Sequence, residues 1–253
     1  MALRIAFDLD GVLADMESEL IRQAETIFGE SMTRKLQERA EETKNEKREN
    51  ASEQETSTDP GSDTLAGTTP PIVKLDMTTR QERRLWRHVA TIENFWQSLP
   101  EIEPGVIARL AAVAVDRRWE IIFLTKRPET AGSTAQVQTQ RWLESKGFPL
   151  PSVFVVQGSR GKIAAALHLD IVIDDRPENC LDVVTDSKAR SILVWRGEEK
   201  ALPAAARRLG IGVVRSVGEC LEILATVDSA RAEDVGVLDR VRRLLGLKEA
   251  ANA

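Results

Sequence analysis

Short, continuous apolar runs alternate with longer amphipathic segments along most of this chain. The short runs have the length and residue types of buried strands, and the amphipathic segments repeat apolar residues at helical spacing. This alternation is typical of an α/β protein with a parallel sheet and helices on both faces. After a first strand at the N-terminus, further strands are predicted at 119–124, 152–156, 171–173, 191–195 and 212–214. Helices are predicted at 15–28, 81–92, 106–115, 134–146, 162–167, 177–184, 201–209, 217–225 and 235–247.

The alternation is interrupted over 33–70, where large apolar residues almost disappear. Glu, Lys, Arg, Asn, Ser and Thr dominate this part, which ends in a stretch rich in Pro, Gly and Thr at 59–71. Such a segment buries too little apolar surface to offset the entropy of ordering it. We therefore predict a disordered or loosely helical insertion, and favour a solvated linker over a charged tail that binds a partner.

Charge and composition narrow the function classes. Charged residues make up 30% of the chain and the net charge is −5, which argues against sequence-independent binding to nucleic acid polymers or anionic membranes. No apolar run approaches the ~20 residues that span a bilayer, and no signal-peptide pattern opens the chain, so we expect a cytoplasmic protein. Two cysteines and two histidines do not form a metal-type spacing, which leaves carboxylates, Lys, Thr or Ser for hydrolytic chemistry.

Two carboxylates, Asp8 and Asp10, close the first strand and are followed by Gly11. Residues two apart in a strand point the same way, and the carboxyl end of an open α/β sheet is where ligands bind. The two carboxylates would repel each other unless a cation lay between them, and their oxygens suit Mg²⁺. A polar exit from strand to turn is the plainer alternative for these three residues.

Further polar residues stand at the ends of two other predicted strands. Thr125 and Lys126 follow one strand, and the pair Asp174–Asp175 closes another, with Lys162 at the start of the helix before it. Separately, they have plain interpretations as a helix cap, a surface lysine and an acidic N-cap region. Their common place at strand ends favours a single site.

Taken in order, DxDGV at 8–12, a hydrophobic strand that ends in Thr125, then Lys162 and the Asp174–Asp175 pair form a recognisable set. The set resembles the four motifs of the haloacid dehalogenase (HAD) superfamily over residues 4–195, apart from the insertion. The resemblance implies a Rossmann-like HAD fold. Within the superfamily, 8–15, 95–105 and 173–177 are similar to the 5′(3′)-deoxyribonucleotidase branch. Lys126 stands where that branch often has Ser, which leaves the substrate open.

The resemblance implies a role for each catalytic motif residue. Asp8 would attack phosphorus and form an aspartyl-phosphate, and Asp10 would act as general acid on the leaving alcohol and then as general base on water. Thr125, with the backbone N–H groups after it, would hold the phosphoryl oxygens. Lys162 would neutralise charge on Asp8 and on the phosphate.

Mg²⁺ is the cofactor that the resemblance implies. Asp8, the backbone carbonyl of Asp10 and one residue of the acidic pair would hold it, with Asp175 as the favoured direct ligand and Asp174 behind it. Such a metal lets an anionic carboxylate approach an anionic phosphate.

The 114 residues between Gly11 and Thr125 exceed what one βα unit needs, and leave room for a small helical cap inserted after the first strand. We expect a HAD-like core at 1–14 and 100–228, a cap at 15–99 and a C-terminal helix and tail at 229–253. Candidate substrate contacts are Lys126 and, in or beside the cap, Met16, Phe95 and Trp96. Core packing is the alternative for Trp96.

The sequence thus predicts a Mg²⁺-dependent phosphomonoester hydrolase for a small phosphate ester, with a 5′-nucleotidase as the specific hypothesis. A HAD phosphatase or phosphotransferase for another metabolite phosphate is the nearest alternative. A non-catalytic HAD-like binding module is the alternative from another class, and the intact motif residues count against it. The sequence leaves open the oligomeric state and whether the 235–247 helix pairs with another subunit or packs on the sheet.

Overall fold

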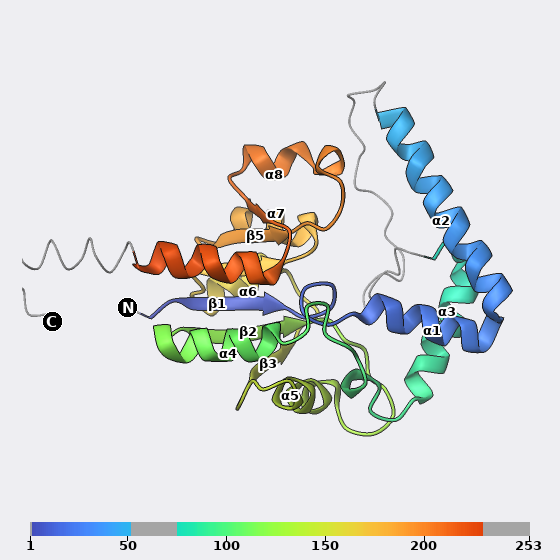
Figure 1. The fold of residues 1–253 in the computed structure, drawn as a ribbon, viewed down its shortest axis with the longest axis horizontal. Helices are drawn as coiled ribbons and strands as arrows, with labels where there is room; N and C mark the ends of the chain where they lie inside the picture. The colour runs from blue at the N-terminus through green and yellow to red at the C-terminus, as the bar shows by residue number, and fades with distance from the viewer. Residues whose placement is uncertain (1, 52–74, 230–253) are drawn as a thin grey trace, which may run out of the picture.

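A computed structural model describes residues 2–51 and 75–229 of the chain. The described strands form one parallel sheet in the order β3-β2-β1-β4-β5-β6 (Figure 1). This order is that of doubly wound Rossmann folds. The strands are β1 (Arg4–Asp8), β2 (Glu120–Thr125), β3 (Ser152–Val155), β4 (Ile171–Asp174), β5 (Arg190–Val194) and β6 (Gly212–Val214).

Helices cover both faces of the sheet because the central strands bury side chains on both sides. One face packs against α4 (Val106–Arg117), α5 (Ala135–Ser145) and the helix over 217–229. The other face packs against α6 (Arg160–Ala166), α7 (Pro177–Asp186) and α8 (Ala204–Arg208). Two short 3₁₀ turns are also present, η1 (Phe95–Gln97) and η2 (Glu199–Ala201). The predicted α/β fold class is confirmed.

The strand register brings the carboxyl ends of three strands to one edge. Phe7 in β1 lies opposite Phe123 in β2 and opposite Ile173 in β4. β1 is also where the strand order reverses, because β2 lies on one side of it and β4 on the other. Ligands of such sheets bind outside the carboxyl ends at this switch point.

Three helices lie beyond the carboxyl end of β1, at the right of Figure 1: α1 (Met16–Phe28), α2 (Glu30–Ala51) and α3 (Thr79–Thr91). Asp15 caps α1 by accepting a hydrogen bond from the backbone N–H of Ser18, and Thr78 with Gln81 forms a capping box at α3. Buried side chains such as Leu20 and Leu85 join these helices to the main hydrophobic core.

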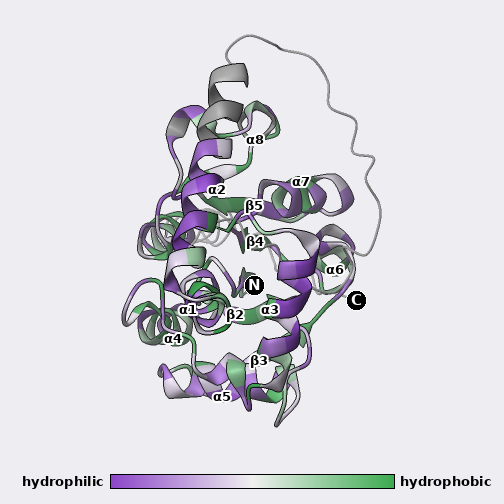
Figure 2. Ribbon diagram, turned by 90° about the vertical axis from the view of Figure 1, so that its right-hand side faces the viewer, coloured by the Kyte–Doolittle hydropathy of each residue, from purple (hydrophilic) through white to green (hydrophobic). Residues whose placement is uncertain are grey.

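Part of the predicted insertion is a regular helix. The sequence predicts a disordered or loosely helical insertion over 33–70; of this, 33–51 belongs to the helix α2, and 52–70 lies outside the described residues. Figure 2 colours α2 mostly as hydrophilic, in agreement with its composition. One turn nevertheless buries Thr33 and Leu36 completely. The backbone carbonyl of Leu36 also accepts from the N–H of Asp76, which ties α2 to the segment before α3.

None of the described helices is both long enough and apolar enough to cross a bilayer. The predicted helix at 235–247 lies outside the described residues.

We expect Leu36→Ala to lower the free energy of unfolding by about 2–3 kcal/mol, because it removes a fully buried side chain from an otherwise polar helix. Met32→Ala is the matched control on the same helix, since Met32 is 39% exposed, and should cost less than about 1 kcal/mol. Urea unfolding of the full chain measures both changes. Equal losses would show that Leu36 does not anchor α2.

Candidate functional site

The turn after β1 places two acidic motifs in contact. Its backbone closes through hydrogen bonds from the N–H groups of Leu13 and Ala14 to the carbonyl of Leu9, and Gly11 has a φ of +93°. A Cβ at Gly11 would lie 2.0 Å from Oδ2 of Asp175. Glycine is therefore required here for both its φ and its lack of a side chain, and Asp175 packs directly on the turn.

Asp8 and Asp174 face each other across neighbouring strands. Ala6 pairs with Val172 in register, so the residues two positions later, Asp8 and Asp174, project from the same face. Arg160, the first residue of α6, forms ion pairs with both carboxylates, at 3.7 Å from its Nε to Oδ2 of Asp174. All three side chains are at most 10% exposed. One guanidinium thus bridges two buried carboxylates.

The contacts expected of Lys162 are made by Arg160. Lys162 is exposed, and its backbone N–H donates to Ser159, which caps α6. The buried face of α6 carries Arg160, Gly161 and Ala164. Residues four apart share a helix face, so Arg160 follows Ala164 toward the sheet while Lys162 points away. This helical phase is the signal in the sequence that identifies Arg160.

Asp10 has a separate cationic partner, Arg127, which the sequence analysis missed. Nη2 of Arg127 lies 2.7 Å from Oδ1 of Asp10, and its Nε lies 2.9 Å from Oδ2. The hydroxyl of Thr125 also donates to Oδ2, at 3.1 Å. Arg127 comes two residues after Thr125 and so projects from the same side of the extended chain, which is the only local signal for it.

Arg127 is held in a fully buried socket. Its Nη1 donates to the hydroxyl of Thr139 at 2.9 Å. The guanidinium carbon lies 4.9 Å from the ring centre of Trp96 and 5.6 Å from that of Trp142. The side chain has no exposed area. Cation–π contacts and hydrogen bonds together compensate for burying this charge.

Two of the expected substrate contacts belong to this socket or to the core behind it. Trp96 and Phe95 are 0% and 1% exposed, and they pack edge to face. The indole N–H of Trp96 donates to the carbonyl of Pro128 at 2.9 Å. Both rings are buried in this structure, which favours core packing over substrate contact. Met16 is 7% exposed at the start of α1, and Lys126 is half-buried at the end of β2.

Burial and mutual repulsion perturb the acidic groups at this edge. Burial, then the charge of Asp174, raises the pKa of Asp8 well above its usual range, although Arg160 opposes this. Burial also raises the pKa of Asp174, against the effects of Arg160 and of hydrogen bonds from Asn179 and the backbone. Burial and the charge of Asp174 raise the pKa of Asp175 to about 7. The site therefore carries more negative charge than its surroundings stabilise.

The carboxylate oxygens at this edge of the sheet are the type of ligand that a hard divalent cation prefers. Oδ1 of Asp175 is buried and has no hydrogen-bond partner, and burial followed by the charge of neighbouring carboxylates raises the pKa values of Asp8 and Asp175. In their present rotamers, however, no three acidic, His or Cys side chains of the described residues converge into a closed ligand set. Asp174 turns toward Asn179 and Asp10 toward Arg127. Asp174, rather than Asp175, lies beside Asp8 and shares its guanidinium.

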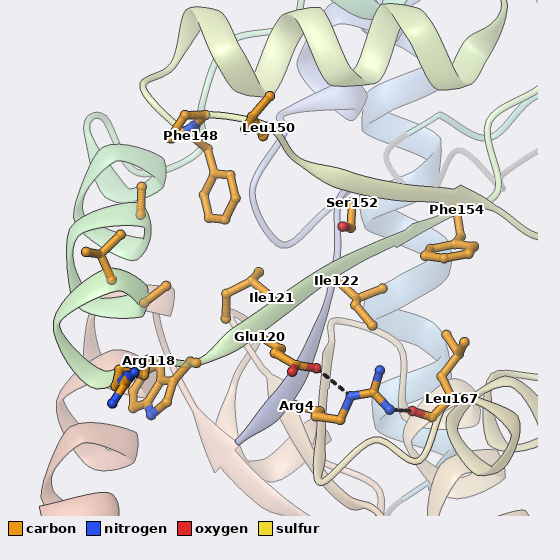
Figure 3. Close-up of a pocket in the computed structure, with 15 residues that line it drawn as sticks. Arg4, Arg118, Glu120, Ile121, Ile122, Phe148, Leu150, Ser152, Phe154 and Leu167 are labelled. Carbon is orange, nitrogen blue, oxygen red and sulfur yellow. Dashed lines mark hydrogen bonds and ion pairs between the residues drawn. The ribbon is translucent and has the colours of Figure 1, made fainter. Parts of the chain in front are cut away.

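A separate groove lies at the other edge of the sheet. Figure 3 shows this cavity of about 640 Å³, which includes Arg4 and Glu120 at the amino ends of β1 and β2. Leu150 and Phe154 expose apolar surface along it. It contains none of the acidic motif residues. The acidic residues at the carboxyl ends of the strands are thus separated from this groove by the length of the strands.

Comparisons with known proteins find similarity in structure. A hydrolase from Pseudomonas syringae is 16% identical, with a TM-score of 0.46, over 90% of this chain and 98% of that one. A HAD family hydrolase from Deinococcus radiodurans, with bound phosphate and sodium, is 16% identical, with a TM-score of 0.48, over 89% and 96%. A phosphonoacetaldehyde hydrolase-like protein from Oleispira antarctica is 14% identical, with a TM-score of 0.47, over 90% and 93%.

At such identities and TM-scores the likeness says nothing about the activity of this chain. No protein-family model matches the sequence, and no curated protein matches it.

We expect Arg160→Met to lower the free energy of unfolding by about 3–5 kcal/mol at neutral pH in EDTA, because it leaves two buried carboxylates without their cation. Lys162→Met is the matched control and should change it by no more than about 0.5 kcal/mol, since Lys162 is exposed. Denaturant unfolding measures both. A larger loss from the Lys162 variant would reverse the assignment.

The raised pKa of Asp175 predicts a pH dependence of stability. The folded protein holds this proton up to about pH 7, while the unfolded chain releases it near 3.8, so its contribution is present below that value and is lost as the pH rises toward 7. Asp175→Asn removes this loss. In EDTA, the variant should gain stability relative to wild type between pH 5 and pH 8, by about 3 kcal/mol. A pH-independent difference would contradict the shift.

Proposed function

We propose that this protein is a phosphomonoester hydrolase that works through an aspartyl-phosphate on Asp8. The observation that carries the proposal is the separation of two carboxylates, Asp8 and Asp10, onto two different buried guanidiniums at the switch point of the sheet. A nucleophile and an acid–base group need different environments within reach of one substrate atom. The spacing of the two residues and their separate partners supply both.

Asp8 acts as the nucleophile in this proposal. A bond forms between its carboxylate oxygen and phosphorus as the bond from phosphorus to the ester oxygen breaks. Arg160 stabilises the negative charge that the carboxylate and the phosphoryl group bring together, which is the role that the sequence analysis gave to Lys162. Thr125 and the N–H groups after it bind phosphoryl oxygens once substrate displaces the hydroxyl from Asp10.

Asp10 moves the protons. Its carboxyl gives a proton to the departing ester oxygen, and the resulting carboxylate takes one from the water that attacks the aspartyl-phosphate. That attack forms the new bond between oxygen and phosphorus and releases the Asp8 carboxylate. The residues that would hold Mg²⁺ are Asp8, the backbone carbonyl of Asp10, Asp174 and Asp175. A bound Mg²⁺ supplies positive charge that reduces the repulsion between carboxylate and phosphate.

The helices α1–α3 serve as a cap in this proposal, with domain limits at 15–99, and select the leaving group. Their place beyond the carboxyl end of β1 supports this role. Met16 remains the candidate contact on the cap and Lys126 the candidate on the core. The similarity of 8–15, 95–105 and 173–177 to the deoxyribonucleotidase branch makes a nucleoside monophosphate the first substrate to try.

Phosphate release from a panel of nucleotides, sugar phosphates and other metabolite phosphates tests the proposal, with Mg²⁺ and with EDTA. We expect release that depends on Mg²⁺ and that falls on the order of 10³-fold or more in Asp8→Asn, because no nucleophile remains. Glu120→Gln is the control, since this exposed carboxylate pairs with Arg4 at the opposite edge of the sheet. It should retain wild-type rates.

The pattern of substrates separates the alternatives. Preference for nucleotides supports the nucleotidase hypothesis, and preference for another phosphate supports the wider phosphatase or phosphotransferase alternative. Absence of release from the whole panel by folded protein that binds Mg²⁺ would overturn the hydrolase and favour a binding module.

A further inference from the structure

Asp10 needs more positioning than Asp8. Asp8 is the last residue of β1 and the sheet fixes its backbone, whereas Asp10 lies in the following turn, beyond the ladder. A group that passes a proton must hold its oxygen near both the ester oxygen and, later, the water. Backbone geometry alone leaves the side-chain torsions of Asp10 free, so another group has to set them.

Arg127 meets this requirement through a two-point contact. Its Nε and Nη2 reach different oxygens of Asp10, at 2.9 and 2.7 Å. Two parallel hydrogen bonds from a planar fork fix the plane of the carboxylate as well as its position, which a lysine ammonium cannot do. Arg127 contacts neither Asp8 nor Asp174, because Arg160 serves those two.

The socket around Arg127 is itself anchored to distant parts of the chain. Trp96 comes from η1 and Trp142 from α5, and each indole N–H donates to a backbone carbonyl, of Pro128 and Leu99 respectively. Thr139, also on α5, holds the remaining Nη1. An arginine so enclosed cannot swing toward substrate. Its guanidinium can therefore act only on the carboxylate of Asp10, with which it forms an ion pair.

We propose that Arg127 is a positioning residue that sets the orientation of the Asp10 carboxyl for proton transfer. The proposal rests on the hydrolase function proposed above. Arg127 touches no reacting atom. It acts through Asp10, so its loss should matter only in steps where Asp10 must give or take a proton.

Leaving groups of different basicity test this role. An alkyl phosphate needs a proton on its departing oxygen, whereas p-nitrophenyl phosphate releases a stable anion without one. We expect Arg127→Lys to lower kcat/KM for a nucleoside monophosphate or glycerol phosphate by about 10²-fold or more, and for p-nitrophenyl phosphate by less than about 10-fold. Arg109→Met removes an exposed guanidinium paired with Glu222, and should change neither value.

Asp10→Asn provides the reference pattern. It should show the same selective loss, and adding Arg127→Lys to it should cause little further selective loss, because both changes remove one function. If Arg127→Lys folds poorly, Thr139→Val is a milder variant. It removes one hydrogen bond to the Arg127 guanidinium and leaves Arg127 itself in place. It should shift the ratio of the two kcat/KM values in the same direction by a smaller factor.

Three results would overturn the proposal in distinguishable ways. If kcat/KM fell equally for both substrates in variants that fold like the wild type, Arg127 would have only a structural role. A further selective loss in the Asp10→Asn background would mean that Arg127 acts elsewhere. Absence of phosphate release by the folded wild type from the whole substrate panel would overturn the hydrolase function, and the positioning role with it.

Discussion

The constraint on which this structure depends is the burial of acidic side chains at one edge of a parallel sheet. Asp8 and Asp174 lie side by side because their strands pair in register, and Asp10 follows within the same turn. Buried carboxylates of like charge cannot all ionise without partners. Arg160, Arg127 and Asn179 therefore provide positive charge or hydrogen bonds to particular carboxylate oxygens at this edge.

Each partner is delivered by a different part of the fold. The N-terminal turn of α6 brings Arg160 to Asp8 and Asp174, and the segment after β2 brings Arg127 to Asp10. The aromatic side chains of η1 and α5 pack on Arg127, so a feature that resembles ordinary core packing also fixes an ion pair. The same residues thus stabilise the fold and divide the carboxylates into two charge environments.

The sequence predicts the sheet well because its signals are local. The six described strands overlap the apolar runs predicted as strands, and their ends bring Asp8, Thr125 and Asp174 to one edge. Errors arise where position depends on helical phase or on distant packing. The motif pattern points to Lys162, whereas Arg160 lies on the buried face of α6 with Ala164 and pairs with Asp8. Trp96 packs on Arg127, which lies 31 residues further along the chain. α2 was underestimated because one buried turn at Leu36 stabilises an otherwise polar helix.

The charge balance also links the fold to the proposed chemistry. Arg127 and Arg160 balance two of the four negative charges of Asp8, Asp10, Asp174 and Asp175. Burial, and then the charge of neighbouring carboxylates, raises the pKa values of Asp8 and Asp175. A phosphate monoester brings further negative charge to this edge, so the carboxylates alone would repel it. In the proposed reaction, a divalent cation bound here would reduce this repulsion. The negative charge that Arg127 and Arg160 leave uncompensated at this edge is thus consistent with the metal-dependent reaction proposed above.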